Sequence, residues 1–319
     1  MKRSNPRLVL GLSVLTALGC GDDSKTDNVC APTADASATG PSIGTERGDA
    51  GSDARAASAT GDATVGSSNF PFSPSNVDLG ALPALPAAGL TISSVCQFDS
   101  EAGTFQCVGN DTHDGQFNFS VATSAGSGRV GILRTRKLQI DVAGQLQVHG
   151  SLPLIVLAED DMQIAGVVSA TAERGKTWAG GFAGSTVEGP GTGPGAGKLG
   201  SGENTQFDAS SGAGYCGVGG TGATKDPAKP GAVGGLAYGS PTLIPLIGGS
   251  SGGGEEGGPG GGAVQLVSAT QITIASTGAI SAGGAGGGNG SSGGGAGGSI
   301  LLEAPSVSVL GVLAANGGG

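Results

Sequence analysis

Aromatic side chains are scarce in this 319-residue chain: Phe, Trp and Tyr make up 3% of it, with one Trp and two Tyr. A conventional mixed domain built around an aromatic core is therefore not expected. Sugar-binding sites commonly use aromatic platforms, so the same scarcity argues against a lectin. Hydrophobic residues still reach 37%, much of it Val, Ile, Leu and Ala, which is enough for a narrow aliphatic core.

Basic residues are also few, because 15 Lys and Arg face 25 Asp and Glu, for a net charge of −10. Nucleic acids and anionic membrane surfaces both need a basic patch on the protein that binds them. The charge therefore argues against either partner, and the acidity serves mainly solubility.

Histidine occurs twice, as His113 and His149, and the five cysteines show no close-paired spacing of the kind that zinc sites use. We therefore predict no metal site and no cofactor from the sequence.

Glycine, by contrast, accounts for 67 residues, about three times ordinary usage, without the Gly-X-Y period of collagen. In residues 283–298 eleven of sixteen positions are Gly. Glycine loses the most backbone entropy on ordering, so such a run stays mobile unless its neighbours hold it in place.

The N-terminus reads as an export signal. Lys2, Arg3 and Arg7 precede the apolar run of residues 8–19, which ends in small residues before Cys20 and is too short to span a membrane. The tetrapeptide ALGC at 17–20 resembles the lipobox of bacterial lipoproteins, with Ala where Leu is usual. The resemblance implies that residues 1–19 are removed and that Cys20 carries a lipid. An ordinary signal peptide with an incidental cysteine is the alternative.

Gly21 follows that cysteine where lipoproteins kept at the inner membrane of enteric bacteria have Asp, which favours the outer membrane. The next fifty residues are mostly Ser, Thr, Ala, Gly and Asp and lack apolar mass. We therefore expect residues 20–70 to be a lipid anchor followed by a disordered tether.

The segment VCQFDSEAGTFQCV, residues 95–108, is symmetric about its centre and predicts a β-hairpin with Cys96 opposite Cys107. In an exported protein we expect these two to form a disulfide, with two free thiols as the alternative. The pairing of Cys30 and Cys216 stays open. The hairpin places an N-terminal cap at residues 71–136.

From residue 137 onward a pattern of alternating apolar residues around a turn glycine recurs. Short strands of this kind, repeating every 20 to 30 residues where no insert intervenes, indicate an all-β fold, a parallel β-helix or related β-solenoid over residues 137–319. An antiparallel sandwich is the alternative, because periodicity does not separate the two. The repeats are residues 138–148, 162–170, 272–282 and 307–315.

Three of these repeats end in Ala, at Ala170, Ala282 and Ala315, and glycine-rich sequence follows each. We therefore expect the glycine inserts, chiefly residues 171–262 and 283–298, on one flank of the solenoid. They could be a solvated brush or packed polyproline-II segments, and an apolar island at 238–254 could clamp them to the solenoid. Because the chain stops at Gly319 within a repeat, a truncated product is one interpretation.

Glu159, Asp160 and Asp161 deserve comparison with carbohydrate-cleaving β-helix enzymes, which use paired carboxylates on one solenoid face. Here the three acids share one turn, where Asp is an ordinary turn former, and equivalent turns add only Glu303. Residues 110–115 could surround calcium with oxygens, but a polar turn is favoured. No catalytic residue is predicted.

The ALGC motif, with YCGVGG, YGSPTLIPLIGGS and GGAGGSILLEAPSVSV further on, is similar to glycine-rich exported proteins of myxobacteria and, more loosely, to glycine-rich repeat surface proteins of mycobacteria. The resemblance implies a cell-surface location without a settled activity. We expect a noncatalytic outer-membrane lipoprotein with a structural, adhesive or matrix role, attached by its lipid and contacting extracellular polysaccharide or other surface proteins. A polysaccharide-binding or polysaccharide-cleaving β-helix is the alternative function.

The lipid anchor can be tested directly. Cys20→Ser should leave the precursor unprocessed or release the protein from the membrane fraction, because the lipid is attached to that thiol. Mass spectrometry of the mature N-terminus decides the point: an unmodified peptide that begins elsewhere excludes a lipoprotein.

Overall fold

A computed structural model describes residues 69–109, 111–124, 128–176, 178–200, 209–224, 230–288 and 290–319. The predicted signal peptide, Cys20, Cys30 and nearly all of the predicted tether lie outside these residues. The described part is all-β, apart from one short 3-10 helix, η1 (Leu79–Ala81). None of its helices is long and apolar enough to cross a membrane.

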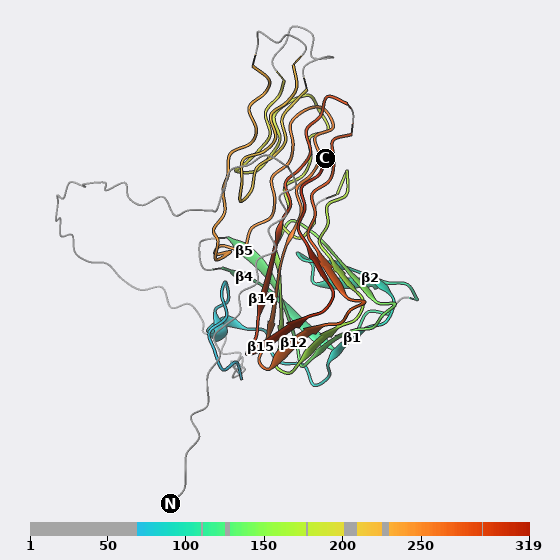
Figure 1. The fold of residues 1–319 in the computed structure, drawn as a ribbon. Helices are drawn as coiled ribbons and strands as arrows, with labels where there is room; N and C mark the ends of the chain where they lie inside the picture. Colours follow the sequence, from blue (N-terminus) through green and yellow to red (C-terminus); the bar gives the residue numbers. More distant parts are fainter. Residues whose placement is uncertain are drawn as a thin grey trace, which may run out of the picture.

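Three parallel sheets surround one core, and the chain visits the third, first and second sheets in turn as it completes each coil (Figure 1). The first sheet contains β1 (Leu90–Ile92), β6 (Leu138–Ile140), β9 (Met162–Ile164), β12 (Gln271–Ile274) and β15 (Ser306–Val309). The second contains β3 (Thr104–Cys107), β2 (Val95–Asp99), β7 (Gln145–His149), β10 (Val167–Ser169), β13 (Ala279–Ser281) and β16 (Val312–Ala314). The third contains β4 (Phe117–Thr123), β5 (Arg129–Thr135), β8 (Leu154–Ala158), β11 (Ala263–Ser268) and β14 (Ser299–Glu303).

The coils stack in register, so equivalent apolar residues form ladders inside the solenoid. In the first sheet one ladder joins Leu90, Leu138, Met162, Ile272 and Val307. The first four of these side chains are 0–1% exposed, and residues between ladder positions face outward, as period-2 strands require. The β-solenoid prediction is confirmed, and the antiparallel sandwich is wrong.

The turn glycine of each repeat has a steric cause. A Cβ at Gly166 would lie 2.1 Å from the carbonyl oxygen of Gly144 in the preceding coil. At Gly278 a Cβ would lie 2.2 Å from the Ile164 oxygen, and at Gly311 it would lie 2.1 Å from the Gly278 oxygen. Stacked coils therefore meet so closely at this corner that no side chain fits.

Two antiparallel hairpins close the N-terminal end of the solenoid, where β3 pairs with β2 and β4 pairs with β5. The predicted register is confirmed, because Cys96 lies opposite Cys107 and the two form a disulfide. Aromatic rings cover the end of the core, with Phe98 within 4.7–6.0 Å, centroid to centroid, of three others: Phe105, Phe117 and Phe119. Four of the eight phenylalanines of the chain thus lie at the cap.

A second apolar cluster lies on the outer face of the third sheet. Residues 69–83, which we call the N-terminal strap, cover it with Phe70, Phe72, Val77, Leu79 and Leu82 (Figure 1, blue). Because both faces of this sheet are buried, β8, β11 and β14 are buried at every position.

The ladder can be tested by matched substitutions in β12. Ile272→Ala removes a fully buried side chain and should destabilise the protein by about 2–5 kcal/mol. Thr273→Ala, on the outward face of the same strand, should cost much less. Urea unfolding followed by circular dichroism measures both, and equal losses would contradict the assigned faces.

Candidate functional site

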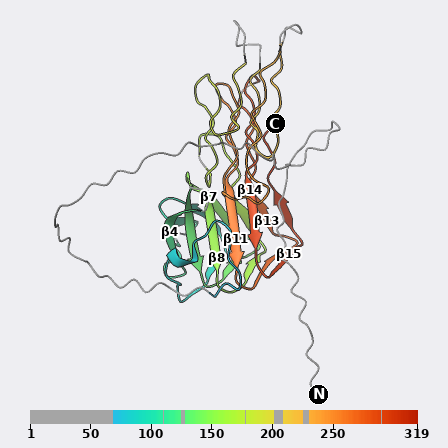
Figure 2. The same cartoon turned by 90° about the vertical axis from the view of Figure 1, so that its left-hand side faces the viewer.

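The glycine-rich inserts leave the solenoid at one corner, between the second and third sheets. Residues 170–262 connect β10 to β11, residues 282–298 connect β13 to β14, and residues 315–319 follow β16. Figure 2 shows these segments as one bundle that projects from the solenoid, and we call the described part of it the glycine lobe. The prediction that the inserts share one flank is confirmed.

Hydrogen bonding in the lobe repeats every three residues. Successive residues of one segment donate backbone N–H bonds to three different neighbours: Gly252 to Gly258, Gly253 to Ser211 and Gly254 to Gly189, at N···O distances of 2.8–3.1 Å. Three residues before Gly252, Gly249 donates to Gly261 of the same neighbouring segment as Gly258. Three residues before Gly254, Ser251 donates to Thr192 of the same segment as Gly189. This is the threefold repeat of a polyproline-II-like helix, bonded sideways to its neighbours.

Glycine is required because the segments approach one another through their backbones. A Cβ at Gly234 or Gly260 would lie 1.8 Å from a neighbouring carbonyl oxygen, and one at Gly298 would lie 1.7 Å from the Gly262 oxygen. Of the two alternatives open from the sequence, packed extended segments are therefore correct for the described lobe, and a solvated brush is wrong.

The apolar island of the lobe packs on the outer face of the third sheet, as the sequence suggested. Leu246 joins the cluster beneath the N-terminal strap. The amide of buried Asn76 donates to the Leu243 carbonyl at 3.0 Å and its oxygen accepts from the Leu246 N–H at 3.1 Å. The strap and the lobe thus hold each other in place.

The two tyrosines are structural members of the lobe. Their rings meet edge to face with centroids 5.0 Å apart, and Tyr238 donates to the Gly248 carbonyl at 2.6 Å. Burial raises the pKa of Tyr238 well above its usual value. Tyr215 is 9% exposed and donates to the Ile247 carbonyl, so neither ring forms an open platform for a sugar.

One face of the lobe carries exposed aliphatic side chains. Val233 and Leu236, three residues apart on one segment, are 68% and 65% exposed. The neighbouring antiparallel segment places Val218, 70% exposed, and Thr221 beside them, because Gly219 bonds Gly235 and Gly222 bonds Ala232. We call Val218, Val233 and Leu236 the aliphatic row. Their backbones are fixed by the lobe, so the row is a preformed surface.

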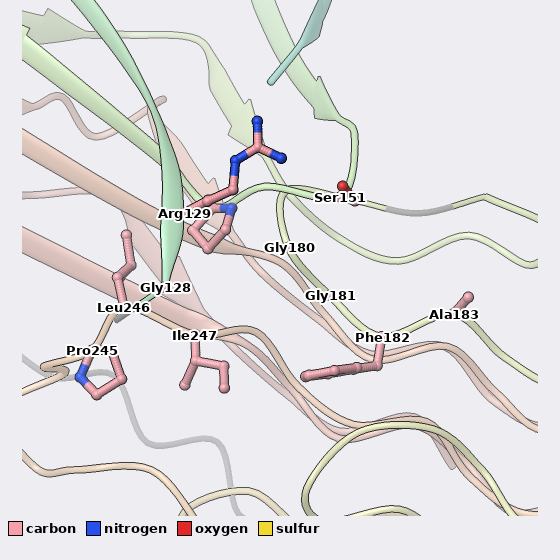
Figure 3. Close-up of a pocket in the computed structure, with 11 residues that line it drawn as sticks. Gly128, Arg129, Ser151, Gly180, Gly181, Phe182, Ala183, Pro245, Leu246 and Ile247 are labelled. Carbon is pink, nitrogen blue, oxygen red and sulfur yellow. The ribbon is translucent and has the colours of Figure 1, made fainter. Parts of the chain in front are cut away.

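A cavity of about 510 Å³ lies where the lobe meets the solenoid. Its walls are mainly apolar side chains and backbone, and Figure 3 shows the Arg129 side chain pointing away from Phe182 and Ile247. Specific ligand pockets place a few convergent polar groups among apolar walls, and these lining residues offer no such convergence.

The carboxylates considered for catalysis have structural partners. Glu159 is 4% exposed, forms a buried ion pair with Arg134 and accepts the Asn69 N–H of the strap at 2.9 Å. Asp160 is exposed, and Asp161 accepts from the Gln163 amide. The three neighbours in sequence therefore do not converge on one site.

Glu303 is 1% exposed and lies on the outer face of the third sheet. It accepts bonds from the backbone and hydroxyl of Ser75, at 3.0 and 2.8 Å, and from the Gln265 amide at 2.6 Å. This carboxylate anchors the strap to the last coil, a role that the sequence did not reveal.

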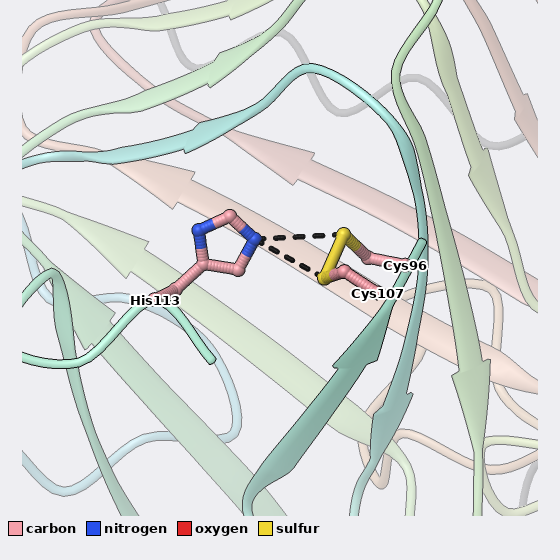
Figure 4. A group of neighbouring side chains, drawn as sticks. All are labelled: Cys96, Cys107 and His113. Atoms are coloured by element: carbon pink, nitrogen blue, oxygen red, sulfur yellow. Dashed lines mark hydrogen bonds between the residues drawn. A yellow bond between two sulfur atoms is a disulfide. The ribbon is translucent and has the colours of Figure 1, made fainter. Parts of the chain in front are cut away.

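The polar turn that begins at Asp111, considered from the sequence as a calcium site, instead directs the His113 side chain into the cap. Asp111 accepts the His113 N–H at 2.8 Å, as in an ordinary polar turn. His113 is 3% exposed, and its Nε2 lies 3.3 Å from Cys107 Sγ and 3.5 Å from Cys96 Sγ (Figure 4). Sequence reasoning missed this contact, although His113 follows the second cysteine by only six residues.

Comparison of the chain with protein families, with curated proteins and with solved structures finds no match.

Two glycines of the lobe give a matched test of its packing. Gly234→Ala brings a Cβ against the Gly219 carbonyl and should destabilise the lobe by about 1–3 kcal/mol. At Gly220 a Cβ meets nothing within 4 Å, so Gly220→Ala should be neutral or slightly stabilising. Hydrogen exchange of lobe amides measures both effects, and equal protection in the two variants would refute backbone-to-backbone packing.

Proposed function

We propose that this protein is a noncatalytic lipoprotein of the cell surface, in which the solenoid is a rigid stem and the glycine lobe is the part that makes structural or adhesive contacts. The observation that carries the proposal is the ordering of sequence-distant inserts into one bundle at one corner. Ordering so much glycine is entropically costly, and the close backbone packing that offsets it gives a stiff, displayed body.

The aliphatic row supports an adhesive role for that body. Exposed apolar residues gathered on one face indicate an interaction site more often than residues scattered singly do. Here the row belongs to the lobe, and backbone hydrogen bonds from Gly219 to Gly235 and from Gly222 to Ala232 hold its two segments together. A preformed surface loses little conformational entropy when it binds.

The placement of the acids supports the noncatalytic part of the proposal. A polysaccharide-cleaving solenoid needs two carboxylates flanking an open substrate site. The carboxylate oxygens of Glu159 and Glu303 instead bond Arg134, Gln265 and the strap, and both side chains are buried.

The location rests on the sequence. In this proposal Cys20 carries the lipid, residues 20–70 are the tether, and the outer membrane holds the protein with the lobe exposed to extracellular polysaccharide or other surface proteins. The net charge of −10 supports partners other than nucleic acid.

The aliphatic row provides the test. The triple variant Val218→Asn, Val233→Asn and Leu236→Asn should reduce attachment of cells that display the protein, while stability stays within about 0.5 kcal/mol per site because all three side chains are exposed. The matched control is Val142→Asn, which changes a 70% exposed valine on the stem. Loss of attachment in the control, or none in the triple variant, would remove the row from the proposal.

Deletion of the first insert tests the wider role of the lobe. Residues 171–262 can be removed and Ala170 joined to Ala263, because Gly262, the residue before Ala263, donates its N–H to the Ala170 carbonyl at 2.8 Å and the two ends are therefore close. Attachment or matrix association should fall, while the β circular-dichroism signal of the stem remains. Full attachment without the first insert would overturn the adhesive proposal.

A further inference from the structure

The disulfide cap contains a cluster of possible metal ligands. Cys96 Sγ, Cys107 Sγ and one imidazole nitrogen of His113 all lie within 4.8 Å of one another. In Figure 4 the imidazole edge points at both sulfur atoms at once. In the disulfide state this nitrogen is within hydrogen-bonding distance of both sulfurs, at 3.5 Å from Cys96 Sγ and 3.3 Å from Cys107 Sγ.

Several contacts hold His113 in this orientation. Its backbone has φ of 55°, a left-handed conformation that is uncommon for a residue with a side chain. The Asp111 turn fixes the backbone, and the ring packs edge to face on Phe105 with centroids 4.9 Å apart. The ring is thus positioned before any ligand arrives.

We propose that Cys96, Cys107 and His113 bind a zinc ion when the two cysteines are in the dithiol form. The chain is synthesised with thiols, so this state precedes the disulfide and needs no reductant. Zinc binding forms two Zn–S bonds and one Zn–N bond, and the two thiol protons pass to solvent. Oxidation by a partner disulfide then transfers two electrons from the thiolates to that partner. The Zn–S and Zn–N bonds and the partner's S–S bond break, the Cys96–Cys107 bond forms, and the partner leaves as two thiols that take up protons from solvent while zinc is released.

The geometry suits this ion. Zinc lies about 2.3 Å from sulfur and about 2.0–2.1 Å from nitrogen, so tetrahedral ligand atoms lie about 3.5–3.8 Å apart. The two S···N distances, 3.3 and 3.5 Å, are close to that already. Opening the disulfide separates the sulfurs, and β3 can accommodate the change because it is the edge strand of its sheet.

Asp111 completes the arrangement without touching the metal. Its carboxylate lies 3.4 Å from His113 Nδ1, the nitrogen that faces away from the sulfurs. Zinc-bound histidines usually direct their other nitrogen at a carboxylate or carbonyl, which fixes the ring and raises its basicity. The same carboxylate is 59% exposed, and an Asn at this position keeps a side-chain oxygen that can accept the His113 N–H.

Cobalt titration of the full chain provides the test. After reduction with a phosphine, Co²⁺ should produce thiolate-to-metal charge-transfer absorption that Zn²⁺ abolishes by competition, and the oxidised chain should produce none. His113→Ala should weaken binding more than tenfold, and Asp111→Asn should weaken it about tenfold. His149→Ala and Cys216→Ser are the matched controls and should bind as the parent does.

X-ray absorption of the zinc-loaded parent keeps the test independent of any variant's folding. Two sulfur ligands and at least one imidazole nitrogen are expected in the first shell. Absence of the charge-transfer band in the reduced chain, unchanged affinity in Asp111→Asn, or a zinc shell without imidazole would overturn the proposal.

Discussion

The close approach of a carbonyl oxygen to a glycine Cα is the contact on which both halves of this molecule depend. In the solenoid it sets the distance between stacked coils at the turn glycines, as where the Gly144 oxygen occupies the place of a Gly166 side chain. In the lobe the same contact recurs between segments that are distant in sequence. The fold therefore uses glycine as the residue that lets backbones meet, and its high glycine content is a packing requirement.

Much of this architecture could be predicted from the sequence because it depends on regular patterns of apolar residues over short stretches of the chain. Apolar alternation around Gly144, Gly166, Gly278 and Gly311 gave the strands and their turn, and the mirror symmetry of residues 95–108 gave the hairpin register. The common terminal Ala of three repeats located the lobe. The order within the lobe could not be predicted, because a three-residue hydrogen-bond period leaves no mark on a sequence in which nearly every residue is small.

The side-chain sites were harder to predict for a different reason. Glu303 bonds Ser75, 228 positions away, and Glu159 bonds Asn69, so their roles depend on where a long segment returns. His113 was set aside because its partners showed no familiar metal-ligand spacing. Its proximity to both cysteines follows only once the hairpin is folded, since Cys96 and Cys107 then form one end of the cap. A hairpin with a histidine shortly after its second cysteine was the available signal.

The N-terminal strap has a consequence for the order in which the chain folds. Coils of a solenoid normally contact only their neighbours, so they can assemble and fray one at a time. The strap instead bonds the last coil at Glu303, the one before it through Asn76 and Gln265, and the capped end through Arg134 and the Pro83 carbonyl. Its residues are synthesised before all of these coils, and its partner Glu303 is synthesised 228 residues after Ser75. The strap can therefore complete its bonds only after the coil of β14 has been synthesised, and its docking converts a stack of separable coils into one cooperative unit.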